Sequence, residues 1–414
     1  MKVVIYNLGC KVNQYEGYSM GNILEKSGCE VCYDLSPADM YIINSCAVTK
    51  EAERKSSQTI AKIKKINSEA EIIVCGCASQ KNPEHFSDKK VTFVFGTASK
   101  GEILNILGRK GCMLKELPLN YEDNLEQRTF RTRAYIKIQD GCDNFCSYCI
   151  VPFLRGRSRS RPIDSVLAEI ARTGNCNEIV LTGINLSAYG RKEGYSLADL
   201  VVSLSGVDKR IRLGSLEVNV ITSELLTSLK NLKMFCPHFH LSLQSGSDSV
   251  LKRMNRHYSV SEYAEKVELI RKFYPMAAVT TDIIAGFPEE TEEEFAETLA
   301  FAEKIRFSAA HVFPYSVREG TAAAKMPQLP PEIKNERARL LSEKTAVSEN
   351  EYRKSFYGHT AEVLTEEFKS PYTIGHTREY LKVYIAEKIP HNILINVKIG
   401  DMYLDGVFGV PVTE

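Results

Sequence analysis

Hydrophobic and polar positions show two alternating patterns along the first 120 residues. The short apolar runs are VVIYNL, MYIINS, EIIVCG and VTFVFG, and between them lie longer stretches with helical spacing, such as EAERKSSQTIAKIKKI. Strands that alternate with helices are typical of βαβ units and a parallel sheet. We therefore predict an α/β parallel-sheet domain over residues 1–120.

A second alternating series begins at Ala134, after the polar, aperiodic linker LPLNYEDNLEQRTFRTR. Its expected strands are YIKIQDG, EIVLTG, RIRLGSLE, HFHLSLQSGS, VTTDIIAGF and AAHVFPYS, and its helices include PIDSVLAEIARTG, SVSEYAEKVELIRKF and TEEEFAETLAFAEKI. Six strand–helix repeats are fewer than the eight of a closed α/β barrel. This pattern predicts an open, partial (β/α)6 barrel over residues 134–354.

The pattern changes again after KMPQLPPE. A long charged helix over about residues 332–354 is expected first, and short β-rich pieces follow it: TAEVLTE, YLKVYIAE, ILINVKIG and YLDGVFGV. Short strands without a further helix predict a small all-β, OB-like barrel over residues 355–414. The fold class is therefore α/β and multidomain, with three units in series.

Composition adds the class of protein. With 414 residues, 43% hydrophobic and 25% charged, the chain has the make-up of a soluble globular protein. No stretch reaches the roughly 18 apolar residues of a membrane span, and the chain turns polar at Asn7, too early for a signal-peptide core. We expect a cytoplasmic protein without a membrane partner, in which twelve cysteines serve metal or redox chemistry rather than disulfides.

Charge is nearly balanced overall, at +1, but residues 128–161 carry eight Lys or Arg against two Asp. Arg155, Arg157, Arg159 and Arg161 alternate with small residues, and in an extended segment such side chains project to one side. We predict that they contact RNA phosphates; the alternative is a solvated charged surface. Residues 355–414 hold five Lys or Arg against eight Asp or Glu, so an RNA-binding face there is small. Its candidate residues are Lys369, Arg378 and Lys382.

A cluster of thiols follows the first strand of the second series. Cys142, Cys146 and Cys149 have the spacing C-x3-C-x2-C in one loop. A closed structural zinc site needs four ligands, yet no histidine occurs between His85 and His238. Three ligands leave one metal position open, which favours a 4Fe-4S cluster over structural zinc.

A second set of thiols is predicted from the first sheet. Cys10 and Cys46 close two expected strands, and Cys77 comes just beyond a third. The carboxyl ends of parallel strands meet at one edge, so these three would converge, again with one position open. For Cys10 the alternative is a small buried side chain; for Cys77 it is its neighbour Cys75, which still belongs to the strand.

The cysteine loop at 142–149 resembles that of the radical S-adenosylmethionine (SAM) superfamily, with Tyr148 at the aromatic position. The resemblance implies that the open iron binds SAM, which is cleaved to a 5′-deoxyadenosyl radical. Polar and glycine residues at the ends of the next strands match positions that contact SAM in this superfamily. These residues are Thr182, Gly183, Glu217, Gln244, Ser245 and Gly286.

The whole chain is similar to the methylthiotransferases of that superfamily. The motifs that carry the resemblance are LGCKVNQYE, NSCAVT, CGCASQ, GCDNFCSYCIVPFLRGRSRSR, EIVLTGINLSAYG, LSLQSGSDSVLKRMNR, TTDIIAGFPEET and HVFPYSVREGT. The resemblance implies an N-terminal cysteine domain, a radical SAM barrel and a C-terminal TRAM domain. It also implies two 4Fe-4S clusters, the auxiliary one on Cys10, Cys46 and Cys77.

Within this family, KVNQ after Cys10 and RGRSRSR resemble the branch that acts on N(6)-threonylcarbamoyladenosine beside the tRNA anticodon. The expected reaction is methylthiolation of carbon 2, with one SAM as methyl donor and a second as radical source. Expected partners are the tRNA anticodon loop, a flavodoxin- or ferredoxin-type electron donor and a sulfur source. The alternatives are the same chemistry on isopentenyladenosine or a ribosomal-protein aspartate, or a non-catalytic iron–sulfur RNA-binding protein.

Overall fold

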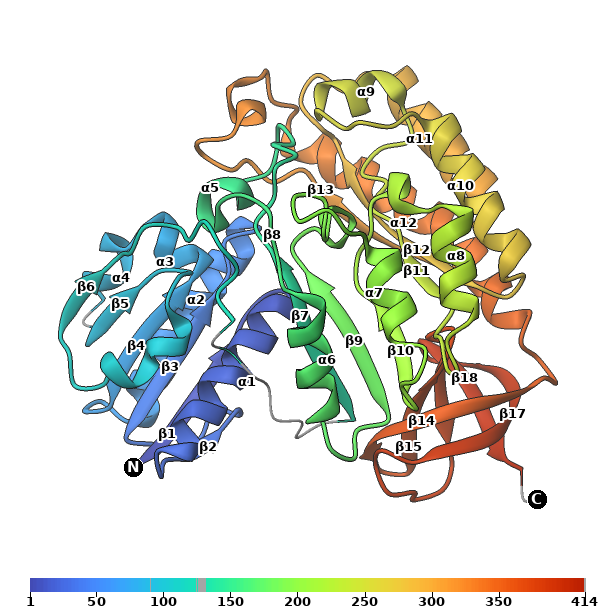
Figure 1. Cartoon of the computed structure of the whole chain (residues 1–414). Coiled ribbons are helices and arrows are strands. Elements are labelled where there is room, and N and C mark those ends of the chain that lie inside the picture. The colour runs from blue at the N-terminus through green and yellow to red at the C-terminus, as the bar shows by residue number, and fades with distance from the viewer. Residues whose placement is uncertain (90, 124, 126–131, 413–414) are drawn as a thin grey trace.

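Three units follow one another along the chain in the computed structural model, which describes residues 1–89, 91–123, 125 and 132–412 (Figure 1). The first unit is built on a six-stranded sheet of order β2-β1-β3-β4-β5-β6, with every neighbouring pair parallel, as predicted. Its strands are β1 (Lys2–Asn7), β2 (Glu30–Cys32), β3 (Met40–Ser45), β4 (Glu71–Gly76), β5 (Phe93–Phe95) and β6 (Gly111–Met113).

Helices cover both faces of this sheet. They are α1 (Lys11–Lys26), α2 (Lys50–Ile66), α3 (Cys77–Lys81), α4 (Glu84–Ser87) and the 3-10 helix η1 (Lys100–Asn105). The helix α2 begins where the Thr49 hydroxyl accepts a hydrogen bond from the amide of Ala52, as N-terminal caps do. One face of α2 buries Ile60 and Ile63 while its charged residues face outward, which explains why the sequence pattern located it well.

The second unit holds six parallel strands in barrel order, joined as β7-β9-β10 and β11-β12-β13. A parallel bridge between Leu216 and Leu241 links the two halves. The strands are β7 (Arg133–Asp140), β9 (Glu178–Gly183), β10 (Arg210–Leu213), β11 (His238–His240), β12 (Ala278–Ala285) and β13 (Ala309–Pro314). The outer edge of β7 pairs with the short antiparallel strand β8 (Arg159–Ser160) rather than with β13, so the barrel is partial.

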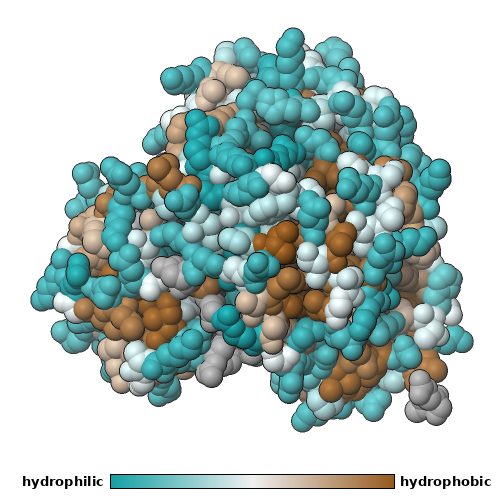
Figure 2. Space-filling model, in the orientation of Figure 1, coloured by the Kyte–Doolittle hydropathy of each residue, from teal (hydrophilic) through white to brown (hydrophobic). Residues whose placement is uncertain are grey.

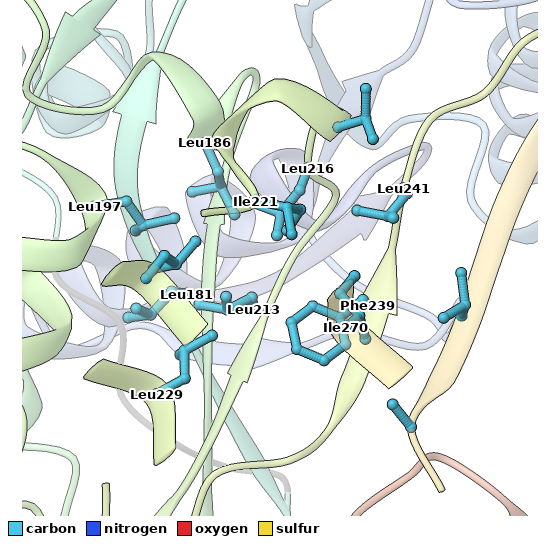
Figure 3. Packing of buried hydrophobic residues seen from close by; sticks show 14 of the residues in the cluster. Leu181, Leu186, Leu197, Leu213, Leu216, Ile221, Leu229, Phe239, Leu241 and Ile270 are labelled. Carbon is cyan, nitrogen blue, oxygen red and sulfur yellow. The ribbon is translucent and has the colours of Figure 1, made fainter. Parts of the chain in front are cut away.

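Helices wrap the outside of this barrel (Figure 1). They are α6 (Ile163–Ala171), α7 (Leu197–Ser203), α8 (Ser223–Lys230), α9 (Asp248–Arg253), α10 (Val260–Phe273), α11 (Glu292–Ile305) and α12 (Pro331–Lys354), with η2 (Leu186–Ala188), η3 (Val218–Val220) and η4 (Ala322–Lys325) between them. The short helix α5 (Val151–Arg155) packs instead against α3 of the first unit. Leucine, isoleucine and phenylalanine side chains of the strands and helices interlock, with Leu181, Leu213 and Phe239 among them (Figure 3). This core fixes the strand ends that carry the candidate site.

The predicted fourth barrel strand is shorter than expected. We predicted a strand over HFHLSLQSGS, but β11 ends at His240. Beyond it the chain makes only isolated bridges, at Leu241 and Gln244, and Gln244 adopts a left-handed backbone with φ 69°. A left-handed residue interrupts the extended ladder, and periodicity alone does not reveal that break.

The third unit is a closed five-stranded barrel of order β14-β15-β16-β18-β17, in agreement with the expected all-β end. Its strands are β14 (Thr360–Lys369), β15 (Tyr372–Thr377), β16 (Lys382–Ile385), β17 (Leu394–Tyr403) and β18 (Gly406–Pro411). We did not predict β15, because YTIGHT is short and follows β14 after only two residues. The barrel sits beneath β9 and β10, near the amino ends of their strands (Figure 1).

Hydrophilic residues predominate over the upper part of the face in Figure 2, and apolar residues gather in smaller groups near its centre and lower part. Within the described ranges, no helix has the length and apolar character needed to cross a membrane.

Candidate functional site

Three thiols meet at one edge of the N-terminal sheet. Cys10 is in the turn after β1, Cys46 follows β3 directly, and Cys77 follows β4 as the first residue of α3. Because β1, β3 and β4 are adjacent and parallel, their carboxyl ends bring the three residues to the same edge. The charges of Cys10 and Cys77 both influence the Cys46 thiol.

The turn at Gly9 brings Cys10 close to Cys46. Gly9 has φ +91°, and a Cβ at this position would lie 2.6 Å from the Cys46 sulfur. Only glycine fits both the backbone and the space. Burial, reinforced by the charges of Cys77 and Cys10, raises the pKa of Cys46 to about 12, while the amide of Val48 opposes this rise.

Cys75 and Cys77 pack in different parts of the core. Cys75 is fully buried in the strand, among the side chains that include Ile73, and its thiol donates to the Asn44 Oδ1 at 3.7 Å. Cys77 lies beyond Gly76, whose φ of 100° turns the chain out of the strand. This arrangement supports Cys77 over Cys75 as the partner of Cys10.

The second triad lies in the loop after β7. The amide of Cys149 donates to the Cys146 carbonyl at 2.9 Å, which forms a tight turn between these two residues. The Arg256 Nη1 is 3.3 Å from the Cys146 sulfur, and the Asn185 Nδ2 is 3.7 Å from the Cys142 sulfur. N–H donors and a cation beside the sulfur atoms stabilise thiolates and tune iron–sulfur clusters.

Burial raises the pKa of Cys149 to about 12, and the amide of Val151 opposes this rise. Burial likewise raises the pKa of Cys142, against an amide donor from Asn144. All twelve cysteines of the chain are free thiols.

Both triads provide the three thiolates that a 4Fe-4S cluster with one open iron needs. In the described part of the chain, no three His, Cys, Asp or Glu side chains are grouped tightly enough to bind one ion. A 4Fe-4S cluster instead holds each thiolate on a different iron, so it accepts ligands that are farther apart. The glycine cradle at Gly9 and the N–H donors around Cys142, Cys146 and Cys149 agree with that interpretation.

A polar network connects the loop at 142–149 to the barrel. The Glu217 Oε1 accepts a hydrogen bond from the Asn144 Nδ2 at 2.5 Å and forms an ion pair with the Arg256 Nη1 at 2.9 Å. Arg256 also donates to the carbonyl of Ser242 at 3.3 Å. Glu217, one of the predicted SAM contacts, therefore lies beside the cysteine loop.

A cavity of about 690 Å³ runs through the barrel between the first triad and the C-terminal barrel. Thr182 and Gly183, two of the predicted SAM-contacting residues, line it together with Cys10 and Lys11. Lys11 is the first residue of α1, which packs against β7 and β9. Burial, followed by Arg212 and Arg133, lowers the pKa of Lys11.

The other predicted SAM-contacting residues have different surroundings in the structure. Ser245 is fully buried, and its hydroxyl faces Thr298 of α11 at 3.3 Å, which contradicts a contact with the ribose. A Cβ at Gly286 would lie 2.9 Å from the Cα of Lys334 in α12, so packing already explains this glycine. Gln244 is half-buried at the strand break, and Tyr148 packs on the apolar group that contains Phe287.

The arginine stretch contradicts the predicted row of phosphate contacts. Arg155 is 1% exposed, Arg159 5% and Arg161 3%. Arg155 ends the helix α5 and Arg159 lies in β8, so the segment is not one extended strand. Their partners are Glu16, Asp140, Asp123 and Glu169. The arginines that alternate with small residues form internal ion pairs. In the sequence, such arginines cannot be told apart from a row of phosphate-binding arginines.

Arg157 alone of the four is exposed, with 64% of its side chain accessible, over the ring of Phe145 and 3.4 Å from Asp143. Two further positive residues of the predicted patch, Arg128 and Arg131, lie outside the described residues. In the C-terminal barrel, Arg378 donates to the carbonyl of Phe235 and so faces the second unit rather than solvent. The remaining candidates are ion-paired: Lys369 with Glu367, and Lys382 with Asp405.

Sequence reasoning did not identify Arg256 or Asn185 as parts of the site, and it named Lys11 only as part of the KVNQ motif. Arg256 lies within the motif LSLQSGSDSVLKRMNR, which located the region but not the residue. Only the packing of α9 against the cysteine loop, where the amide of Ser147 donates to the Met254 carbonyl at 2.9 Å, reveals it.

Two family models match the chain. Residues 2–96 match the uncharacterised protein family UPF0004, and residues 136–302 match the radical SAM superfamily. The threonylcarbamoyladenosine tRNA methylthiotransferase MtaB of Thermotoga maritima is 42% identical over 88% of this chain and 87% of its own length. The Bacillus subtilis protein of that name is 37% identical over 98% and 96%.

A tRNA-2-methylthio-N(6)-dimethylallyladenosine synthase of Syntrophomonas wolfei is also similar, at 34% identity over 99% of this chain and 97% of that protein. Among solved structures, the radical SAM methyltransferase TsrM from Kitasatospora setae, with cobalamin and a [4Fe-4S] cluster bound, has a TM-score of 0.56 at 12% identity and covers 78% of this chain and 77% of its own. The radical SAM enzyme OxsB has a TM-score of 0.55 at 12% identity, over 85% and 55%. These likenesses support the fold alone.

Proposed function

The chain belongs to the radical SAM methylthiotransferase family, and from this premise we propose that it attaches a methylthio group to carbon 2 of N(6)-threonylcarbamoyladenosine beside the anticodon of tRNA. The observation that carries the proposal is the pair of three-cysteine sets at the carboxyl ends of two neighbouring parallel sheets. The relatives named MtaB are 42% and 37% identical to this chain, against 34% for the dimethylallyladenosine synthase of Syntrophomonas wolfei, which favours threonylcarbamoyladenosine over dimethylallyladenosine.

The residues fit two 4Fe-4S clusters. Cys10, Cys46 and Cys77 would hold the auxiliary cluster, and Cys142, Cys146 and Cys149 the radical SAM cluster. When bound, the clusters and two molecules of SAM supply the sulfur, the methyl group and the radical that removes hydrogen from carbon 2. An aromatic C–H bond is too strong and too weakly acidic for side-chain acid–base chemistry, so a radical route is expected.

The protein's own side chains would position these groups. Arg256 and Asn185 donate toward the sulfur atoms of Cys146 and Cys142, and hydrogen bonds to the sulfur atoms tune an iron–sulfur cluster. Glu217 holds Arg256 and Asn144 in place. Thr182 and Gly183 would contact SAM, because they lie at the end of β9 and open to the cavity.

We also propose that residues 1–120, 134–354 and 355–414 are the functional units, and that the last is a TRAM domain. Its side chains dock on the barrel: Glu366 binds Arg133 at 2.6 Å and Glu362 binds Arg210 at 2.8 Å. With five Lys or Arg against eight Asp or Glu, this domain would contribute only a small RNA contact. Arg157 is the exposed cation beside the cysteine loop and the better candidate for a phosphate contact.

Deletion of the gene, followed by mass spectrometry of tRNA nucleosides, tests the function. We expect the 2-methylthio derivative of threonylcarbamoyladenosine to disappear and the unmodified nucleoside to accumulate. The wild-type gene should restore it, and a Cys142→Ala gene should not. An unchanged profile would overturn the proposal; loss of the methylthio group from isopentenyladenosine, or from a ribosomal-protein aspartate, would identify another target.

A further inference from the structure

Lys11 occupies an unusual place for a charged side chain. It begins α1 immediately after Cys10 and lines the cavity inside the barrel together with Thr182 and Arg212. The helix α1 lies along β7 and β9, so its first turn reaches the barrel from its open side. The Lys11 ammonium is thus placed between the first cysteine triad and the barrel interior.

No partner neutralises this ammonium in the described residues, since no hydrogen bond or ion pair joins it to another side chain. The guanidinium groups of Arg212 and Arg133 oppose its charge. Glu178 and the Cys10 thiol act in the opposite direction, but Glu178 is already bound to both arginines, at 2.7 and 2.6 Å. A partly buried, unpaired ammonium beside two guanidinium groups is unfavourable unless an anion completes the site.

The cavity's own carboxylates do not complete it. Asp282 lies 3.3 Å from the His240 Nε2, and Asp405 lies 2.9 Å from the Lys382 Nζ. Glu349 pairs with Arg353. None of the acidic residues that line the described cavity is ion-paired with Lys11.

We propose that Lys11 is a specificity-determining residue that binds the carboxylate of the threonylcarbamoyl group. This inference rests on the proposed function and goes beyond it by assigning the recognition of the substrate's side chain. In adenine, carbon 2 and the carbon that bears N6 flank the same ring nitrogen, N1. A substituent on N6 therefore extends beside the carbon that receives the sulfur, and when that carbon approaches the Cys10 triad the substituent lies near the next residue, Lys11.

The same position explains how two related nucleosides are distinguished. Threonylcarbamoyladenosine carries a carboxylate, whereas dimethylallyladenosine carries a hydrocarbon at the same nitrogen. A site that presents an unpaired ammonium favours the first and disfavours the second, because the hydrocarbon would leave the charge buried and unpaired.

Anticodon stem–loop RNAs with three different adenosines test the proposal. The first carries threonylcarbamoyladenosine, the second its methyl ester, in which the carboxylate is neutral, and the third dimethylallyladenosine. With reconstituted wild-type enzyme, we expect KM to be roughly ten- to a hundredfold lower for the acid than for the ester, the range of one charge-assisted contact. In Lys11→Met that ratio should fall to about one, through a higher KM for the acid, and Lys11→Arg should restore part of it.

Matched controls separate this role from a structural one. Lys26→Met, at the exposed last turn of the same helix, should keep the wild-type ratio. Lys11→Met should retain full iron content and the wild-type urea unfolding midpoint, as expected if the substitution leaves the fold and the cysteine sets intact. A backbone phosphate as the true ligand would weaken acid and ester equally, and an unchanged acid-to-ester ratio in Lys11→Met would overturn the proposal. If wild-type enzyme modified none of the RNAs, the proposed function itself would fail instead.

Discussion

Arg155 donates two hydrogen bonds to Glu16, from Nη1 to Oε1 at 2.8 Å and from Nη2 to Oε2 at 3.0 Å. The two residues are 139 positions apart, one at the end of α5 beyond the second cysteine triad and the other on α1 beyond the first. Lys100 and Lys137 bind the same carboxylate. Although burial acts in the opposite direction, the charges of Arg155, Lys100 and Lys137 hold the pKa of Glu16 well below its usual range. This buried pair fixes the two triads relative to each other.

Removal of Arg155 should therefore destabilise the protein severely. In Arg155→Leu the Glu16 carboxylate loses its bidentate partner, and breaking a buried pair from one side costs about 3–5 kcal/mol. The exposed Arg157→Leu is the matched control and should cost about 0–1 kcal/mol. Urea unfolding midpoints measure both. Equal midpoints for the two variants would contradict a bracing role for Arg155.

Iron analysis tests the two cysteine sets. Reconstituted wild-type protein should bind about eight irons, and the variant with Cys10, Cys46 and Cys77 all replaced by Ala about four, because each 4Fe-4S cluster needs its own thiolates. A triple variant that kept all its iron would disprove the second site.

The neighbouring cysteines provide an internal control for that experiment. Cys77→Ala should lose most of the auxiliary iron, and Cys75→Ala should keep it, since Cys75 is fully buried in the strand. Loss of the auxiliary iron in Cys75→Ala, with retention in Cys77→Ala, would make Cys75 the ligand instead of Cys77.

The sequence pattern was sufficient to predict the sheets. It was also sufficient to predict that thiols far apart in the sequence lie at one sheet edge. Parallel strands must align their carboxyl ends, so Cys10, Cys46 and Cys77 could be grouped without a structure. The sequence pattern did not predict the left-handed turn at Gln244 or the strand β15, because each depends on a local backbone geometry that periodicity does not encode.

The role of the arginines could not be predicted for a different reason. A positive charge has the same sequence signature whether it meets a phosphate or an internal carboxylate. The partner of Arg155 is on α1 and that of Arg161 is on α6, and only the packing of these helices brings them together. The role of Lys11 could not be predicted either, since its lack of a partner among the described residues is visible only in three dimensions.

Arg157 should contribute to RNA binding through charge. In Arg157→Ala, affinity for the anticodon stem–loop should fall similarly for modified and unmodified adenosine, because a phosphate contact carries no base information. The slope of log affinity against log salt concentration should become shallower by about one. The exposed Arg339, ion-paired within α12, offers the control Arg339→Ala; a slope unchanged in Arg157→Ala would assign the contact elsewhere.

Glu178 provides the pH test. It is fully buried at the start of β9, and its Oε1 accepts from Arg133 at 2.6 Å and from Arg212 at 2.7 Å. Burial alone would raise the pKa of Glu178, but Arg212 and Arg133 hold it well below its usual value of 4.5. The same arginines contact the C-terminal barrel: Arg133 pairs with Glu366, and Arg212 donates to the carbonyl of Arg378. The Glu178 carboxylate therefore stabilises the interface between the two barrels.

The sign of the pH dependence follows from the lowered pKa. Below pH 4.5 the unfolded chain binds a proton at Glu178 that the folded protein does not, so stability falls as the pH falls, by up to about 1.4 kcal/mol per pH unit from this group. Above pH 4.5 the contribution is constant. Glu178→Gln should be less stable than wild type at pH 7 and should lose stability more gently between pH 4.5 and 3. The exposed Glu51→Gln should leave the curve almost unchanged. Urea midpoints across this range measure the slopes, and parallel curves for wild type and Glu178→Gln would show that Glu178 titrates normally.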